Sequence, residues 1–238
     1  MSIAENIAQI EEQIAAACRR AVRSPESVRL MAVSKTHPPH AVLEAHAAGV
    51  RVFAENRVQE YAEKREVLQS AGIFGDGGAS VHCIGHLQSN KVRRAVELFD
   101  AIDSVDSLAV AERLNHAATQ TGKRLPVLIE VKVSEEDSKH GLRADSPELN
   151  RLLERMPDLQ HLELRGLMTV PPFADDLEQV RPYFRSLREL RDSLIQRHPK
   201  FALEELSMGM SHDFSVAIEE GSTMVRVGTA IFGARPSR

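Results

Sequence analysis

The sequence predicts an α/β protein built as a closed (β/α)8 barrel (a TIM barrel) with an additional helix at its N-terminus. Eight short apolar segments alternate with helix-like segments along the 238 residues, and no break in composition divides them. Apolar runs of this kind are typical of parallel strands that are covered on both faces. Eight such units in roughly 205 residues fit a barrel better than the rival, a doubly wound open sheet. We therefore expect one domain over residues 1–238.

The N-terminal segment predicts an amphipathic helix over about residues 2–23. Ser2 and Glu5 have the S-x-x-E spacing of a capping box, in which the two residues satisfy each other's backbone N–H groups. Apolar residues then recur at helical spacing: Ile3, Ile7, Ile10, Ile14 and Cys18. Because this helix precedes the first β–α unit, we expect it to cover the bottom or the flank of the barrel.

The eight predicted strands are short apolar runs bounded by glycine, proline or polar residues. In chain order they span residues 30–34, 50–54, 81–85, 101–105, 126–133, 164–170, 205–210 and 224–228. The segments between them predict helices, one of which begins at Pro38 or Pro39 and stops at Gly49, a residue type that favours helix ends. In such a barrel the loops that follow the strands form the working face.

Composition excludes several classes of function. The net charge is −4 without a long basic run, so a nucleic-acid partner is not expected. No stretch reaches the roughly 20 apolar residues of a membrane span, and the first residues lack the apolar segment of a signal peptide. Cys18 and Cys83 lie in apolar surroundings, which suggests reduced thiols. We expect a cytoplasmic protein without a membrane partner.

Lys35 stands where the first predicted strand becomes a loop. Lysines normally occupy solvated faces, and the simplest interpretation is that Lys35 extends its amine from the strand end to solvent. The functional interpretation is a desolvated amine that forms a Schiff base with an aldehyde. The ends of the other strands decide between these two interpretations.

The last two strands predict an anion site. Ser211 is expected to cap a short helix, where free N–H groups favour an anion, and the backbone of Gly228 and Thr229 can approach a ligand closely. Phosphate sites in these barrels are frequently built from the loops after strands seven and eight. Arg226 lies two residues before Gly228 and so points to the same side of its strand. Barrel closure should place it beside Lys35.

An inward arginine could also be structural, paired with Glu55 or Glu130. The functional interpretation combines an imine-forming amine, a phosphate site and an arginine, which are the parts needed to hold pyridoxal phosphate.

Seven segments, in order, resemble the pyridoxal-phosphate homeostasis protein family, which is similar to the barrel domain of alanine racemase. The resemblance runs from about residue 3 to residue 235. The segments are AVSKT at 32–36, FAENRVQE at 53–60, HCIGHLQSNK at 82–91, SKHG at 138–141, GLMT at 166–169, LSMGMS at 206–211 and GSTMVRVGT at 221–229.

The resemblance implies that pyridoxal 5'-phosphate is held as an imine on Lys35, with its phosphate at Ser211 and the Gly228–Thr229 backbone. It also implies that Arg226 faces the pyridine nitrogen. The matching motifs place three further residues in the cofactor site: Asn56, Met168 and Ser207. The family has no established enzymatic activity, so no catalytic residue is assigned.

The chain departs from the family pattern at two positions. Ala54 stands where the family usually has glycine, and Lys132 stands where asparagine is common. The first change could shift the backbone near the ring. The second adds a lysine that could compete for the aldehyde or only add positive charge. We expect neither to abolish binding.

The chain favours a carrier over a catalyst. Two-base racemization needs a proton carrier opposite the lysine, which a tyrosine of a separate domain supplies in alanine racemase, whereas Tyr61 and Tyr183 fall within predicted helices. An arginine at the pyridine nitrogen also weakens the ring as an electron sink. We expect a monomer that holds pyridoxal phosphate and delivers it to apo-enzymes.

Two alternatives remain at this point. One is a fold-type-III racemase-like enzyme that uses His86 or His212 as its second base. Another is a phosphosugar-binding barrel that uses the phosphate site without an imine. A metal site at His82, Cys83 and His86 is not expected, because a strand and its loop do not give the shared face of a helical pair.

Overall fold

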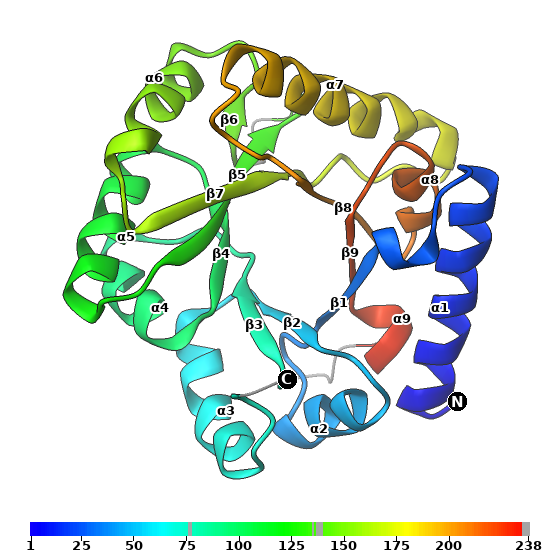
Figure 1. Ribbon diagram of the computed structural model, residues 1–238. Coiled ribbons are helices and arrows are strands. Elements are labelled where there is room, and N and C mark those ends of the chain that lie inside the picture. Colours follow the sequence, from blue (N-terminus) through cyan, green and yellow to red (C-terminus); the bar gives the residue numbers. More distant parts are fainter. Residues whose placement is uncertain (76–77, 135, 137–139, 235–238) are drawn as a thin grey trace.

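The computed structural model describes residues 1–75, 78–134, 136 and 140–234. Eight parallel strands form a ring at its centre, in the pairing order β1–β2–β3–β4–β5–β7–β8–β9 (Figure 1). The ring closes because β9 pairs with β1, which excludes the open-sheet rival and confirms the predicted barrel. The strands are β1 (Arg29–Val33), β2 (Val52–Glu55), β3 (Ser80–Cys83), β4 (Ala101–Val105), β5 (Leu125–Lys132), β7 (Leu162–Met168), β8 (Glu205–Met210) and β9 (Met224–Val227). A two-residue strand, β6 (Leu142–Arg143), adds to the end of β5.

The helices surround this ring (Figure 1). They are α1 (Ile3–Arg20), α2 (Pro39–Ala47), α3 (Val58–Ser70), α4 (Val92–Leu98), α5 (Leu108–Thr121), α6 (Pro147–Arg155), α7 (Arg181–Arg197), α8 (Phe214–Glu219) and α9 (Thr229–Phe232). Each predicted strand and each predicted helix is present. The extent of a single domain over residues 1–238 stays a prediction.

Helix α1 begins as its sequence predicts and ends earlier. The capping box of Ser2 and Glu5 is present. The helix stops at Arg20, short of residue 23, because Val22 turns the chain with φ 53° and the Arg23 N–H bonds to the Cys18 carbonyl. Helix α1 packs against α2, α8 and α9, so it covers the flank of the barrel and leaves the ends of the strands accessible.

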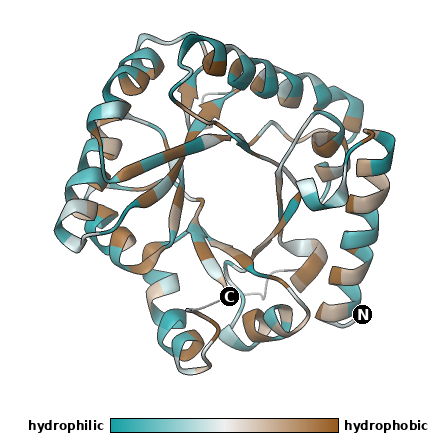
Figure 2. Cartoon of the chain, viewed as in Figure 1, coloured by the Kyte–Doolittle hydropathy of each residue, from teal (hydrophilic) through white to brown (hydrophobic). Residues whose placement is uncertain are grey.

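Alternation along the strands divides the core into two layers. The larger layer fills the space between the strands and the helices, and Figure 2 shows the apolar stripes of the helices. A smaller cluster fills the ring itself: Met31, Val33, Ala54, Leu128, Met168 and Met224. Residues two apart on a strand share a face, so the residues that continue these inward positions also face the interior.

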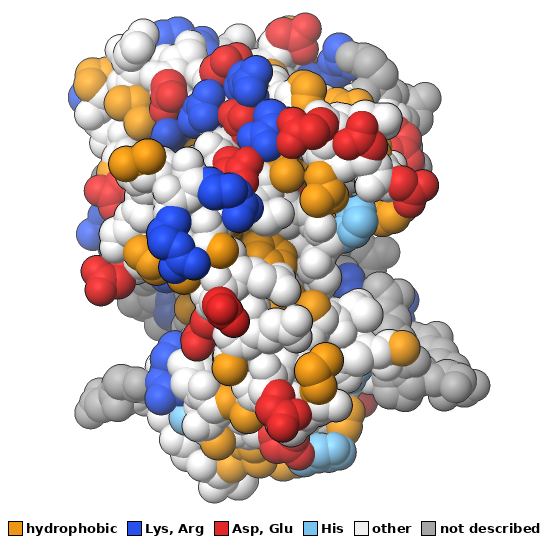
Figure 3. Space-filling model, turned by 90° about the vertical axis from the view of Figure 1, so that its right-hand side faces the viewer, with side chains coloured by type: hydrophobic (Ala, Val, Ile, Leu, Met, Phe, Trp, Pro, Cys, Tyr) orange, Lys and Arg blue, Asp and Glu red, His pale blue; other side chains and the backbone are white. Residues whose placement is uncertain are grey.

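Charges of both signs are interspersed on the face that carries α1 (Figure 3). Ion pairs join this face to its neighbours, for example Arg20–Glu219 at 2.6 Å and Arg181–Glu219 at 2.8 Å. This pattern agrees with the absence of a long basic run. In the part of the chain that the structure describes, no helix is long and apolar enough to cross a membrane.

Candidate functional site

The part of the barrel interior that lies toward the carboxyl ends of the strands contains polar side chains, although such interiors are usually filled by branched apolar residues. Arg226 is 3% exposed and continues the inward alternation of Met224. Its Nη1 donates to the Ser207 carbonyl at 2.5 Å and to the Ser207 hydroxyl at 2.9 Å. Its Nη2 donates to the Thr169 carbonyl at 2.6 Å. The guanidinium therefore joins strands β9, β8 and the end of β7 across the interior.

Three acidic side chains lie near Arg226, and Glu55 is not one of them. Burial lowers the pKa of its guanidinium, and the nearby carboxylates of Asp103, Glu130 and Asp213 oppose that shift. The structural interpretation that pairs Arg226 with Glu55 is wrong, because Glu55 faces outward from β2 and binds Lys64 at 2.8 Å. Glu130 is one of three carboxylates that act on Arg226 electrostatically, and Asp103 acts more strongly.

Glu130 is the most perturbed acid of this interior. It lies on β5, two residues after the inward Leu128, and is 7% exposed. Burial raises its pKa to about 7, Asp106 adds to the shift, and Arg226 and His86 oppose it. Glu130 is thus poised to gain or lose a proton near neutrality.

This shift makes a testable prediction about stability. Native Glu130 binds a proton between its ordinary pKa of 4.5 and about 7, where the unfolded chain does not. Stability therefore falls as pH rises through this window, by an amount on the order of 3 kcal/mol for this group. Glu130→Gln should be more stable than the parent at pH 8 and should approach it at pH 4.5. Urea unfolding of both proteins at each pH measures the difference between their free energies of unfolding. A difference that is the same at both pH values would contradict the raised pKa of Glu130.

Lys35 lies beyond the end of β1 and beside β9. The Ser34 N–H continues the ladder to the Ala54 carbonyl, and the chain then turns, with the His37 N–H donating to the Ser34 carbonyl at 3.1 Å. Lys35 is half-buried. Met31 pairs with Arg226 across β1 and β9, so Lys35 lies four residues beyond the position opposite Arg226, and the expected proximity of the two side chains stays a prediction.

Gly228 allows the end of β9 to approach the end of β1 closely. A Cβ at residue 228 would lie 3.2 Å from the Val33 carbonyl, which is tighter than most contacts tolerate. The N–H of Gly228 donates to the Ser211 hydroxyl at 3.2 Å, and the Ala230 N–H approaches the same oxygen at 3.5 Å. Ser211 thereby joins the loop after β8 to the first turn of α9, where Thr229 is exposed.

The expectation that Ser211 caps the next helix is wrong. Helix α8 begins at Phe214 and its N-cap residue is Asp213. The carboxylate of Asp213 accepts from the Met210 N–H at 2.6 Å, which tightens the turn. The Ser211 hydroxyl instead accepts from the backbone of Gly228 and Ala230, and an anion site at these residues stays a prediction.

Asn56 and Met168 complete the predicted set. Asn56 follows β2, and its Oδ1 is buried with no hydrogen-bond partner among residues 1–75, 78–134, 136 and 140–234. Gly85 packs directly against it, since a Cβ there would lie 2.2 Å from the Asn56 carbonyl. Met168 belongs to the apolar cluster below these polar groups. A buried amide oxygen without a hydrogen-bond donor is uncommon in folded proteins.

A buried charge network supports the Lys35 loop and was not predicted. Lys64 on α3 donates to the Ser34 carbonyl at 2.9 Å and to Glu55 and Glu60 at 2.8 Å each. Glu60 in turn accepts from the Thr36 N–H, and Thr36 has φ 68°, which is unusual for a β-branched residue. The network therefore holds the residue after Lys35 in a strained turn.

The sequence contained signals for two of these features. Glu60 and Lys64 have the i,i+4 spacing of a helical ion pair. Glu130 and Lys132 alternate within the apolar run 126–133, which directs both to the face of Leu128.

Of the 138–141 motif, Ser138 and Lys139 lie outside the described residues. A hollow at the opposite end of the barrel, between Arg165 and Glu205, contains none of the site residues.

Comparison with known proteins agrees with this arrangement. Residues 6–236 match the family described as the N-terminal domain of alanine racemase. The pyridoxal phosphate homeostasis protein of Aquifex aeolicus is 43% identical over 235 residues, covering 99% of each chain. Its namesake in Escherichia coli K12 is 44% identical and covers 98% of this chain and 97% of its own. The chain belongs to the pyridoxal phosphate homeostasis protein family. The resemblance that the motifs carry is confirmed.

Solved structures of the family share the whole fold. PipY of Synechococcus elongatus PCC7942, with PLP bound, has a TM-score of 0.86 and 40% identity, and the match covers 98% of this chain and all of PipY. Alanine racemase of Clostridium difficile 630 has a TM-score of 0.72 at 17% identity, which shows a shared fold alone. Members of the pyridoxal phosphate homeostasis protein family are named for homeostasis and not for a reaction.

Proposed function

We propose that this protein binds pyridoxal 5'-phosphate as an imine of Lys35, masks its aldehyde and delivers it to apo-enzymes. The observation that carries the proposal is the closure of β9 on β1, which brings Lys35, Arg226 and the Gly228 backbone to one end of the ring. The family membership and the PLP-bound relative PipY support it.

The residues at this end fit the group. The Ser211 hydroxyl and the N–H groups of Gly228 and Ala230, which donate to that hydroxyl, would hold the phosphate. Asn56 offers a buried amide with an unpaired oxygen, which a ligand donor satisfies. When bound, pyridoxal phosphate supplies an aldehyde for a lysine and an aromatic ring that can act as an electron sink. Apolar Met168 lines the floor beneath the polar groups.

Arg226 favours storage over catalysis. Ser207 and Thr169 hold its guanidinium in place, and if Arg226 faces the pyridine nitrogen, as the resemblance implies, this positive charge would disfavour protonation of the ring. Tyr61 is buried beside Phe99 in the outer core, and Tyr183 lies on α7, so both tyrosines are in helices as expected. Neither is placed on a strand end opposite Lys35.

The proposal also covers the compartment in which the protein acts and its oligomeric state. We infer that the protein acts as a monomer in the cytosol, where its recipients are apo-forms of pyridoxal-phosphate enzymes. Cys18 and Cys83 are free and buried, which suits a reducing compartment. Lys132 stands at the end of β5 as a second lysine of this strand-end face and provides the matched control below.

The absorbance spectrum of the reconstituted protein tests the binding mode. After incubation with pyridoxal phosphate and desalting, the parent protein should retain a protonated imine band. Lys35→Ala should lose the band entirely and release the cofactor on desalting, whereas Lys132→Ala should keep it. Circular dichroism verifies that each variant is folded. An imine band that persists in Lys35→Ala and vanishes in Lys132→Ala would contradict the assignment.

The same sample tests delivery. Adding an apo-enzyme to the loaded protein should reduce the imine band as activity of the recipient appears. A loaded protein that keeps its band in the presence of excess apo-enzyme would refute delivery and leave binding intact. A protein that holds phosphate esters without any imine band would favour the phosphosugar-binding alternative.

A further inference from the structure

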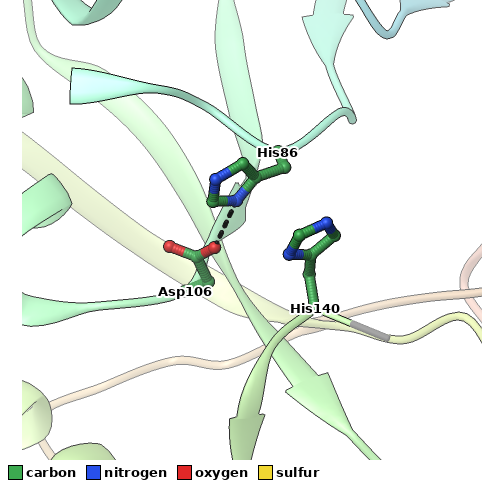
Figure 4. Close-up of side chains that lie close together, drawn as sticks. All are labelled: His86, Asp106 and His140. Atoms are coloured by element: carbon green, nitrogen blue, oxygen red, sulfur yellow. Dashed lines mark hydrogen bonds and ion pairs between the residues drawn. The ribbon is translucent and has the colours of Figure 1, made fainter. Parts of the chain in front are cut away.

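A second cluster of potential ligands lies at the same end of the barrel, over strands β3 to β5. His86 follows β3, Asp106 follows β4 and His140 lies in the loop after β5 (Figure 4). One ligand atom from each residue lies within 4.8 Å of the other two. Three loops that are distant in sequence therefore bring two imidazoles and one carboxylate together.

The contacts among these side chains are direct. His86 Nδ1 lies 2.7 Å from Asp106 Oδ2. The rings of His86 and His140 stack with centroids 4.3 Å apart and an angle of 11° between their planes. Figure 4 shows the carboxylate and the second ring on two sides of the His86 imidazole.

The cluster is accessible to an ion from solvent. The His86 side chain is 42% exposed and that of Asp106 is 12% exposed, while His140 is exposed. A cleft lined by Asn56, His86 and Lys91 opens beside it. Because the two ring planes are nearly parallel, the exposed His140 ring must turn out of the stack before its nitrogen and that of His86 can bind one Zn²⁺ ion.

We propose that His86, Asp106 and His140 form a binding site for a divalent transition metal of the Zn²⁺ class. The donor set decides the class, because two imidazoles with one carboxylate suit Zn²⁺ or Co²⁺, whereas Mg²⁺ and Ca²⁺ prefer oxygen ligands alone. Three protein ligands leave at least one coordination position for water or another ligand. A bound ion would cross-link the loop after β5 to the loop after β3.

This site differs from the metal motif that the sequence argument rejected. His82 faces the interior and pairs with Asp103 at 3.0 Å, and the Cys83 thiol is buried in the outer core. Only His86 of that motif reaches the mouth, and its partners come from later in the chain. Local spacing could not reveal the combination.

Isothermal titration of the full-length, tag-free protein with ZnCl₂ tests the proposal. We expect one ion per chain, and a Co²⁺ titration should develop the d–d absorption of nitrogen–oxygen coordination at the same stoichiometry. His86→Ala, His140→Ala and Asp106→Asn should each weaken Zn²⁺ binding at least tenfold. His116→Ala removes an exposed histidine from α5 and should leave the affinity unchanged.

The titration is done without pyridoxal phosphate, so its outcome does not depend on the proposed function. All four substitutions lie at exposed or half-buried positions, and thermal unfolding verifies that the variants fold. Absence of Zn²⁺ binding at micromolar concentration in the parent would overturn the proposal. Binding that survives in both His86→Ala and His140→Ala would also overturn it.

Discussion

Lys64→Met is expected to lower the free energy of unfolding by about 3–5 kcal/mol, because it removes one partner of a buried ion pair. The Lys64 side chain is 8% exposed and that of Glu55 is 1% exposed. Burial already raises the pKa of Glu55, and Lys64 counteracts that shift. Without the cation, the carboxylates of Glu55 and Glu60 repel each other, and the Ser34 carbonyl keeps only the His37 N–H as a donor.

Equilibrium unfolding in guanidinium chloride measures this effect. Lys200→Met is the matched control, because Lys200 is exposed after α7, and it should stay within about 0.5 kcal/mol of the parent. The double variant Lys64→Met/Glu55→Gln should recover part of the loss, since no uncompensated charge remains there. A Lys64→Met protein as stable as the control would show that the network does not support the Lys35 loop.

Arg226→Met is the second substitution with a large expected effect, again about 3–5 kcal/mol. It leaves the Ser207 and Thr169 carbonyls without their guanidinium donors in a buried interior. It also removes the cation that opposes the raised pKa of Glu130, so that pKa should rise further. Arg226→Lys keeps the charge, yet its single ammonium cannot reproduce the fork that spans β8 and the end of β7.

Two measurements separate the parts of this effect. Chemical unfolding at pH 5 and pH 8 should show that Arg226→Met loses more stability at pH 8, where Glu130 would have to ionise without its partner. Arg226→Lys should lie between the parent and Arg226→Met at both pH values. Equal losses at the two pH values would mean that Arg226 and Glu130 are not coupled.

Barrel closure could be predicted from the sequence because it follows from patterns that are local. Eight apolar runs and their intervening helices fix the order of strands, and an eight-stranded parallel ring must place its last strand beside its first. The neighbourhood of Lys35 and Arg226 follows from that topology together with the alternation of side chains. Closure is present in the structure, whereas the proximity of Lys35 and Arg226 stays a prediction.

Features that depend on turn geometry or on distant loops could not be predicted. Ser211 was expected to cap a helix, but the residue that caps it is Asp213, two residues later. The contact of His86 with His140 joins loops that are more than fifty residues apart, and no local spacing encodes it. The unpaired side-chain oxygen of Asn56 depends on how closely the backbone packs at Gly85.

Borohydride reduction of the loaded protein, followed by peptide mass mapping, tests the central claim most directly. Reduction converts an imine into a stable secondary amine, so the mass of the cofactor stays on the lysine that formed it. The account predicts that the added mass lies on the peptide that contains Lys35 and that Lys132 remains unmodified. Cofactor mass on Lys132 or on another lysine, with an unmodified Lys35 peptide, would contradict it.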